Sequence, residues 1–160
     1  MTIKVGDKMP SGTLKTILAD GPSDVSTDDL FKGRKVAFFG VPGAFTPACS
    51  ATHLPGYVAK ADDLKAKGID AIACMAVNDF FVMKAWGDAS NVEGTVSMLA
   101  DGSAEYTKQL GIELDLSGAG LGLRCTRFSM VVDDGVVSQL YLEEGGNLEV
   151  STAENMLANL

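Results

Sequence analysis

Short apolar runs separated by helix-forming segments are the feature that most limits how this chain can fold. Five runs have the β-branched and aromatic composition of strands. They cover residues 35–41, 69–77, 95–99, 128–132 and 136–142. The runs at 35–41 and 69–77 are apolar rather than alternating, which is typical of strands covered by helices on both sheet faces. This order predicts an α/β fold with a mixed central sheet flanked by helices.

The segments around these strands carry helix and turn signals. Helices are predicted over residues 47–67, 79–89 and 104–110 and in a last segment beginning at Ser151, where Glu154 completes a capping-box spacing. Residues 133–135, Asp-Asp-Gly, predict a hairpin between the last two strands. Residues 1–34 are expected to add an amino-terminal hairpin at Thr13–Leu18 and a short helical turn after Ser26 or Thr27. A length of 160 residues suits a single domain, residues 1–160.

Charge and composition exclude several function classes. The formal net charge of −8 leaves no surplus of cations for nucleic acid or an anionic membrane. No stretch approaches the roughly 18 consecutive apolar residues of a membrane helix, and the first residues lack a secretory pattern. The cytoplasm is therefore the expected location. A lone histidine, His53, with no Cys/His cluster predicts no metal site, and no cofactor is implied.

Three cysteines, Cys49, Cys74 and Cys125, lie at unpaired spacings and without a CxxC motif, which indicates free thiols. Cys49 lies in residues 41–56, which follow a predicted buried strand and open a helix. Thr46 suits the N-cap and Pro47 the first helical position. Cys49 is then the third helical residue, where free N–H groups and the helix dipole favour the thiolate over the thiol.

The surroundings of Cys49 suggest a reactive site, with a structural cysteine as the alternative. The Thr46 hydroxyl falls on the same side of the turn, where it can donate to the thiolate and accept from an incoming peroxide. Pro42 and Phe45 are expected to wall the pocket. His53 has the spacing of a Cys–His pair, but a structural, hydrogen-bonded role is favoured because Pro55 should kink the helix there.

The residues Pro42, Thr46 and Cys49 resemble the peroxiredoxin motif, proline, three residues, Thr or Ser, two residues, cysteine. The longer string at 42–56 resembles the type II branch, which includes the animal type 5 enzymes. Segments at 76–79, 86–87, 99–101 and 127–135 resemble that branch in the same order, so the resemblance covers nearly the whole chain. It implies a thioredoxin-like fold and a thiol peroxidase that reduces hydrogen peroxide and alkyl hydroperoxides.

The resemblance also implies an arginine near the cysteine, and the matching position is Arg127, with Arg124 as the rival. Arg127 is expected to stabilise the thiolate and to hold the peroxide oxygens through its donor fork. The N–H groups of Ala48 and Cys49, with Thr46 and Arg127, are expected to bind the substrate and stabilise the leaving oxygen. Cys49 would end as a sulfenic acid.

The recycling step is predicted from the other thiols. Animal type 5 members have a resolving cysteine before the last helix, and this chain has Val150 at about that place. Cys74 is expected to be buried and inert, whereas Cys125 is a possible accessory thiol because it shares a face with Arg127 if the chain is extended there. A one-cysteine cycle with an external thiol follows. The resemblance favours glutathione with glutaredoxin, with thioredoxin as the alternative.

The sequence also allows two rival functions and suggests a homodimer. A thiol–disulfide oxidoreductase on the same fold lacks a second cysteine near Cys49, since Thr46 and Thr52 hold those positions. A thioredoxin-like binding module with an incidental thiol is the non-enzymatic rival. Type II relatives often pair as homodimers near the active-site loop, and Phe45, Phe80 and Trp86 are expected at that edge unless they belong to the core.

Overall fold

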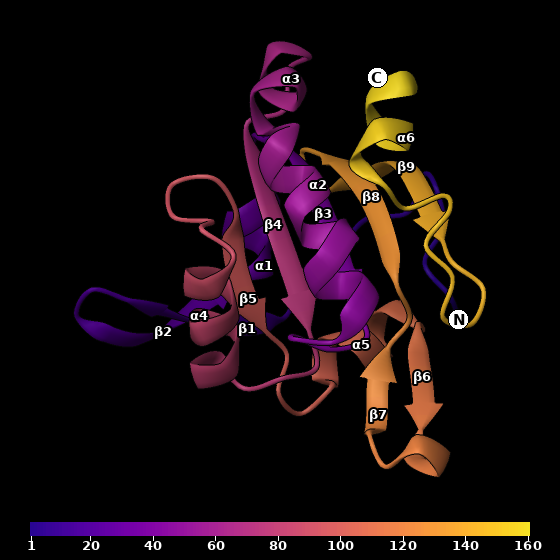
Figure 1. Ribbon diagram of the computed structural model, residues 1–160. Coiled ribbons are helices and arrows are strands. Elements are labelled where there is room, and N and C mark those ends of the chain that lie inside the picture. Colours follow the sequence, from indigo (N-terminus) through magenta and orange to yellow (C-terminus); the bar gives the residue numbers. More distant parts are fainter.

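A seven-stranded mixed sheet runs through the centre of the computed structural model, which describes all residues 1–160 (Figure 1). The strand order is β2-β1-β5-β4-β3-β8-β9. The strands are β1 (Thr13–Leu18), β2 (Gly21–Ser26), β3 (Lys35–Val41), β4 (Ala71–Ala76), β5 (Ser97–Ala100), β8 (Phe128–Asp133) and β9 (Val136–Leu142). β3, β4 and β5 are parallel, whereas β8 is antiparallel to both β3 and β9. The predicted mixed α/β sheet is confirmed.

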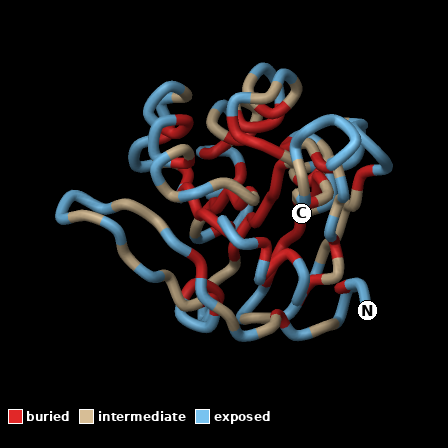
Figure 2. The backbone as a smooth tube through the Cα atoms, turned by 90° about the horizontal axis from the view of Figure 1, so that it is seen from below, coloured by how far each residue is buried: buried red, intermediate tan, exposed pale blue.

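Helices cover both faces of this sheet. They are α1 (Thr27–Phe31), α2 (Leu54–Ala59), α3 (Ala61–Ala66), α4 (Phe80–Ala89), α5 (Glu105–Leu110) and α6 (Ala153–Ala158). One apolar cluster of 22 buried residues takes side chains from α2, α3, α4 and α6, and a second of 18 takes them from α1, α5 and the amino-terminal segment. Buried backbone accordingly forms the middle of the molecule in Figure 2. No helix has the length and apolar character needed to cross a membrane.

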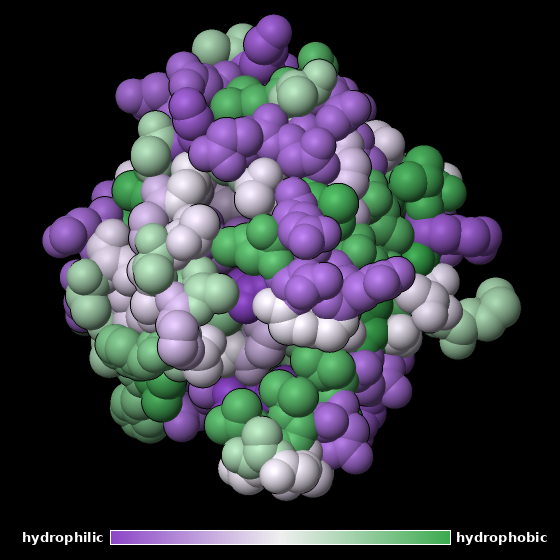
Figure 3. All heavy atoms as spheres, turned by 45° about the vertical axis from the view of Figure 1, so that its right-hand side comes forward, coloured by the Kyte–Doolittle hydropathy of each residue, from purple (hydrophilic) through white to green (hydrophobic).

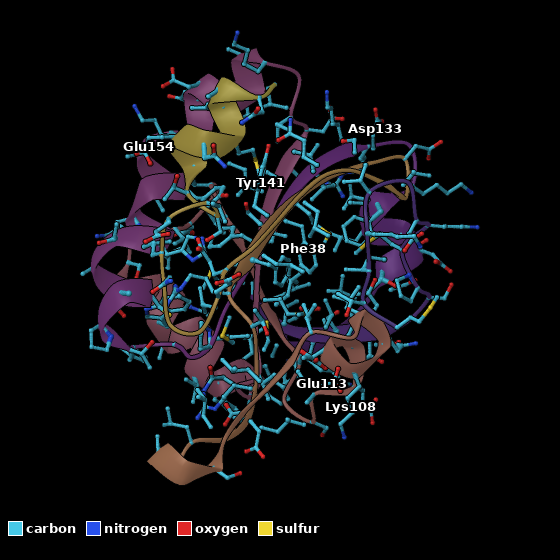
Figure 4. The ribbon with its side chains drawn as sticks, turned by 90° about the vertical axis from the view of Figure 1, so that its right-hand side faces the viewer. Phe38, Lys108, Glu113, Asp133, Tyr141 and Glu154 are labelled. Atoms are coloured by element: carbon cyan, nitrogen blue, oxygen red, sulfur yellow. The ribbon has the colours of Figure 1, made fainter.

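The side chains follow this layering. Phe38, on β3, is fully buried and packs edge-on against Phe31 and Phe128 at ring distances of 5.5 and 5.3 Å. In Figure 4 Phe38 lies in the interior, whereas Asp133 and Glu154 lie at the periphery. The central strands are therefore apolar on both faces because each face packs against its own core cluster.

The amino-terminal arm forms the predicted hairpin and helical turn. β1 and β2 pair from Thr13↔Ser26 to Leu18↔Gly21, and α1 follows at once. The hairpin projects from the body of the molecule (Figures 1 and 2). β1 joins the central sheet through a single register pair with β5, Lys15↔Ala100.

The long helix predicted over residues 47–67 is built in pieces. Helical backbone begins at Pro47, and a π-helical turn, η1 (Cys49–His53), precedes α2. In this turn the N–H of Leu54 bonds to the carbonyl of Cys49, five residues earlier. Pro55 supplies no N–H and its ring crowds the preceding turn, so the predicted kink takes the form of a widened turn. A second interruption at Lys60 separates α2 from α3.

Two parts of the carboxyl-terminal half differ from the predictions. The capping box at Ser151 and Glu154 is wrong, because the cap of α6 is Thr152, whose hydroxyl accepts from the N–H of Asn155 at 3.2 Å. Ser151 instead donates its hydroxyl to Glu143 at 2.6 Å. A separate two-stranded ribbon, β6 (Glu113–Leu116) and β7 (Gly122–Cys125), was not predicted. Its strands are short and the 3₁₀ turn η2 (Ser117–Ala119) joins them, so the strand signal is weak.

Candidate active site

Cys49 lies beyond the carboxyl end of β3, where residues 42–46 form a loop that leads from the sheet into a helix. The N–H of Ser50 bonds to the carbonyl of Thr46 at 2.9 Å and closes the first helical turn. Thr46 thus occupies the predicted N-cap position, Pro47 the first helical position and Cys49 the third. Cys49 has an exposed fraction of 0% and belongs to the larger core cluster. The sulfur is therefore held in a mostly apolar surrounding, next to the N–H groups of a helix start.

The Thr46 hydroxyl does not make one of its two predicted contacts, the donation to the thiolate. Its oxygen lies 2.7 Å from the carbonyl of Gly43, to which it donates its only hydrogen. That hydrogen is therefore engaged with the loop and is not given to the sulfur of Cys49. The lone pairs of the oxygen remain able to accept a hydrogen bond.

The loop before the helix is held from both sides. The N–H of Ala44 donates to the side chain of Asn78 at 2.9 Å, and the Arg124 guanidinium donates to the carbonyl of Pro42 at 3.3 Å. Phe45, 54% exposed, has a φ of 63°, a left-handed conformation that typically costs a non-glycine residue about 1–3 kcal/mol. These contacts offset the strain and fix the loop beside the cysteine. The Asn78 contact was missed from the sequence, although Asn78 lies in the segment 76–79 that carried the resemblance.

Arg127 precedes β8 and is 3% exposed. Its Nη1 lies 3.1 Å from Nδ1 of His53, the last residue of the π-helical turn that begins with Cys49. Its Nε is buried and has no hydrogen-bond partner, and it forms no ion pair with a carboxylate. A buried guanidinium with a spare donor is costly unless it serves an anionic or polar partner. The structure thus brings Arg127 to the turn that carries Cys49.

Arg124 lies on β7 and has other contacts. Its Nε donates to the carbonyl of Leu121 at 2.9 Å, and its Nη1 reaches Pro42 as described above. A Cβ atom at Gly43 would lie 2.9 Å from Nη1 of Arg124. Arg124 therefore braces the loop through backbone carbonyls, whereas Arg127 reaches the helical turn.

The comparisons with known proteins match almost the whole chain. The family model described as Redoxin matches residues 4–157. Peroxiredoxin-2D from Arabidopsis thaliana is 49% identical over 159 residues, which cover 99% of this chain and 98% of the relative. The chain belongs to the peroxiredoxin family. Peroxiredoxin-2E-2, chloroplastic, from Oryza sativa subsp. japonica is 51% identical over 164 residues, with 99% of this chain and 73% of the relative covered.

A solved structure agrees with the assignment of this chain to the peroxiredoxin family. The crystal structure of reduced Prx3 in complex with H₂O₂ from Vibrio vulnificus superposes with a TM-score of 0.95 at 50% identity, covering 99% of each chain. The thioredoxin-like fold and the thiol peroxidase activity predicted from the sequence are confirmed, with a peroxide as substrate and a thiol as reductant.

The other two thiols of this peroxiredoxin are fully buried and free. Cys74 lies within β4, and burial raises its pKa well above the ordinary value. Cys125, the possible accessory thiol, ends β7 and donates to the carbonyl of Thr126 at 3.0 Å, and burial raises its pKa as well. Both are therefore held as protonated thiols, which are weak nucleophiles.

Two of the three aromatic residues expected at the dimer edge have a different environment. Trp86 is 1% exposed, and its Nε1 donates to the hydroxyl of Ser50 at 2.9 Å, so of the two predicted alternatives it takes the core and not the edge. Phe80 is half-buried against the core, and its neighbour Phe81 is 66% exposed instead. Phe45 alone is both exposed and on the active-site loop.

Proposed function

We propose that Cys49 is the thiol that attacks the peroxide and that Thr46 and Arg127 assist it. The observation that supports this most is the buried Arg127 guanidinium, which contacts the helical turn that begins with Cys49. The other two thiols are less suited because burial raises the pKa of each. A positive charge and free helical N–H groups beside one thiol are the arrangement that stabilises a thiolate.

The reaction is a direct displacement. The Cys49 thiolate attacks one peroxide oxygen, and an S–O bond forms as the O–O bond breaks. The sulfur is oxidised to sulfenic acid, and the second oxygen leaves as an alkoxide or hydroxide that takes a proton to give an alcohol or water. Arg127 and the N–H groups of Ala48 and Cys49 stabilise the charge on that oxygen. The Thr46 oxygen accepts the O–H of the peroxide, because its own hydrogen is engaged with Gly43.

Pro42 and the loop around it have a supporting role in this proposal. Pro42 is buried less than the strand before it and carries the carbonyl that Arg124 holds. The ring limits the entry of water, and the fixed carbonyl keeps the loop against the first helical turn. Water exclusion strengthens the interaction between the thiolate and the Arg127 charge.

Recycling is proposed to use an external thiol, glutathione with glutaredoxin in preference to thioredoxin. Val150 holds about the place where a resolving cysteine would lie, and it is 40% exposed. The sulfenic acid condenses with glutathione to a mixed disulfide and water, and glutaredoxin then exchanges that disulfide. Because Cys49 is 0% exposed, we infer that the first helical turn opens before a protein thiol reaches the sulfur.

Substitution of the three thiols tests the nucleophile. Cys49→Ser should abolish peroxide consumption and keep the fold, and the Cys74→Ser, Cys125→Ser double variant is the matched control that should retain turnover. Intact mass after one equivalent of peroxide should rise by one oxygen, or by one glutathione when that thiol is present. Loss of two hydrogens would reveal an internal disulfide and overturn the one-cysteine cycle.

A panel of reductants in one peroxide assay tests the recycling route. Glutathione plus glutaredoxin should support turnover of the wild-type chain and of the Cys74→Ser, Cys125→Ser control. Turnover with thioredoxin alone, at equal reductant concentration, would reverse the order of preference. This result would leave the assignment of Cys49 in place, since the nucleophile and its reductant are tested separately.

The chain is also proposed to form a homodimer. Four exposed apolar side chains belong to the active-site loop or to segments bonded to it: Phe45 on the loop, Phe81 just after Asn78, which bonds to the loop, and Leu121 and Leu123 on the ribbon that Arg124 ties to the loop. Hydrophobic surface is visible at the end of the molecule where this ribbon lies (Figure 3). Burial of such a patch is a common reason for association. Light scattering that shows a monomer at all concentrations would remove this proposal.

The cytoplasm is proposed as the compartment. Three free cysteines, Cys49, Cys74 and Cys125, fit a reducing environment, and glutathione is abundant there. Subcellular fractionation with detection of the native chain tests this, and recovery in an organelle fraction would contradict it.

A further inference from the structure

His53 joins two parts of the molecule through both nitrogens of its ring. Nδ1 lies 3.1 Å from Nη1 of Arg127, and Nε2 lies 3.0 Å from the carbonyl of Ser151. A guanidinium only donates hydrogen bonds, so Nδ1 must accept. A carbonyl only accepts, so Nε2 must carry the proton. The two partners together fix a neutral imidazole with its hydrogen on Nε2.

The carbonyl of Ser151 is itself held in place by hydrogen bonds of its own segment and of Tyr57. One carboxylate oxygen of Glu143 accepts from the N–H groups of Glu149, Val150 and Ser151 at 2.8–2.9 Å and from the Ser151 hydroxyl at 2.6 Å. The phenol of Tyr57 donates to the same carbonyl at 2.9 Å. Burial alone would raise the pKa of Glu143, but the hydrogen bonds from Ser151, Glu149 and Val150 lower it, so the carboxylate stays ionised. His53 is thus oriented by a segment between β9 and α6 that is hydrogen-bonded to Glu143.

A neutral hydrogen-bond acceptor such as His53 suits the Arg127 guanidinium if this guanidinium is to stabilise an anion at Cys49. A carboxylate in the place of His53 would orient Arg127 but would also neutralise its charge. A neutral imidazole orients the guanidinium and leaves the positive charge available. Burial and the Arg127 charge both lower the pKa of His53, to about 4, so the ring stays neutral across the physiological range. The ring also packs against Phe39 at a centroid distance of 5.0 Å, which limits its rotation.

We infer that His53 is a positioning residue, which holds the Arg127 guanidinium toward Cys49 as a neutral acceptor and takes its own orientation from Glu143 through the Ser151 carbonyl. This inference rests on the proposed role of Arg127 in peroxide reduction. His53 does not take a proton from Cys49 in this arrangement, because its only acceptor nitrogen is occupied by Arg127.

Two substitutions of His53 separate its two contacts. His53→Asn places an acceptor oxygen near the position of Nδ1 and gives up the contact with Ser151. His53→Gln places a donor near the position of Nε2 and gives up the contact with Arg127. The Gln variant should react with hydrogen peroxide roughly ten- to a hundredfold more slowly than the Asn variant, the range expected for one hydrogen bond to a charged group. Equal rates, or a slower Asn variant, would indicate a structural role and overturn the inference.

The rate is the second-order constant for oxidation of the reduced chain by hydrogen peroxide, followed by the fluorescence of Trp86. This is the only tryptophan, and it donates to Ser50, the residue after Cys49. Urea unfolding of each variant verifies that it is folded before its rate is compared. If neither His53 variant folds, Glu143→Gln replaces them, since it weakens the side-chain anchor of Ser151 and keeps the backbone bond from residue 143 to the carbonyl of Arg127.

Combination with Arg127→Ala decides between failure of this inference and failure of the proposed function. If His53 acts through Arg127, His53→Gln, or Glu143→Gln in its place, should slow the parent chain and add no further loss to Arg127→Ala. A full additional loss in the Arg127→Ala background would overturn the inference alone. An Arg127→Ala rate equal to that of the wild type would remove the role of Arg127 and the inference together.

Discussion

Acidification from pH 7 to pH 5 should destabilise the folded chain through His53. Its pKa is about 4 in the folded state, lowered by burial and by the Arg127 charge, against 6.5 for an ordinary histidine. Between pH 6.5 and pH 4 the His53 side chain is protonated in the unfolded chain and neutral in the folded chain. The contribution of the neutral ring to the free energy of unfolding is therefore fully present above pH 6.5 and is lost as the pH falls through this range. At about 1.4 kcal/mol per pH unit, the linkage relation gives a loss of about 2 kcal/mol between pH 7 and pH 5.

Urea unfolding at a series of pH values, followed by Trp86 fluorescence, measures this loss. His53 is the only histidine, and other side chains titrate mainly outside pH 5–7, so few other groups change charge there. His53→Gln is the matched control. The variant and the wild type can have different free energies of unfolding at pH 7. The free energy of unfolding of the variant should not fall by the additional roughly 2 kcal/mol between pH 7 and pH 5. The same slope in both proteins would refute the reasoning, because the proton would then bind elsewhere or bind equally well in the folded state.

Three further experiments test the site and its support. Arg127→Ala should slow peroxide reduction by roughly two to three orders of magnitude, equivalent to about 2–4 kcal/mol of transition-state stabilisation, and Arg124→Ala by much less; the reverse order in stopped-flow rates would exchange their roles. Thr46→Val should be at least roughly tenfold slower than Thr46→Ser, which keeps the hydroxyl, and equal rates would remove the acceptor role. Gly40→Ala should cost roughly 1–3 kcal/mol in urea unfolding, since its Cβ would lie 2.2 Å from the Phe128 ring; an unchanged midpoint would show that the ring moves freely.

The central strands and the start of the active-site helix were predictable because each depends on local sequence. β3 was predicted at its observed bounds, Lys35–Val41, since a strand buried on both faces leaves a continuous apolar run. The helix start followed from Pro47, which is tolerated in the first turn and disrupts the interior of a helix. Cys49 then falls three residues into the helix by counting alone.

The contacts that complete the site depend on residues far apart in the chain. His53 meets Arg127 across 74 positions and Ser151 across 98, and no spacing rule signals such pairs. The error at the α6 cap has the same origin. Ser151 and Thr152 are both good caps, and the choice is made by Glu143, which takes the Ser151 hydroxyl. The burial of Trp86, by contrast, agrees with the helical periodicity of its segment, which favoured a core position over the dimer edge.

Because of the π-helical turn, the direction of the Cys49 side chain depends on the number of residues between Cys49 and Pro55 as well as on their types. A π turn amounts to an α-helix with one extra residue, and each helical residue advances the chain by about 100° around the axis. Deletion of one residue between Cys49 and Pro55 would let the segment wind as a regular α-helix. With α2 fixed by its packing, everything before the deletion would then swing by about 100°. A peroxiredoxin shortened by one such residue would keep Thr46, Cys49 and Arg127 in its sequence and still aim its sulfur away from the guanidinium.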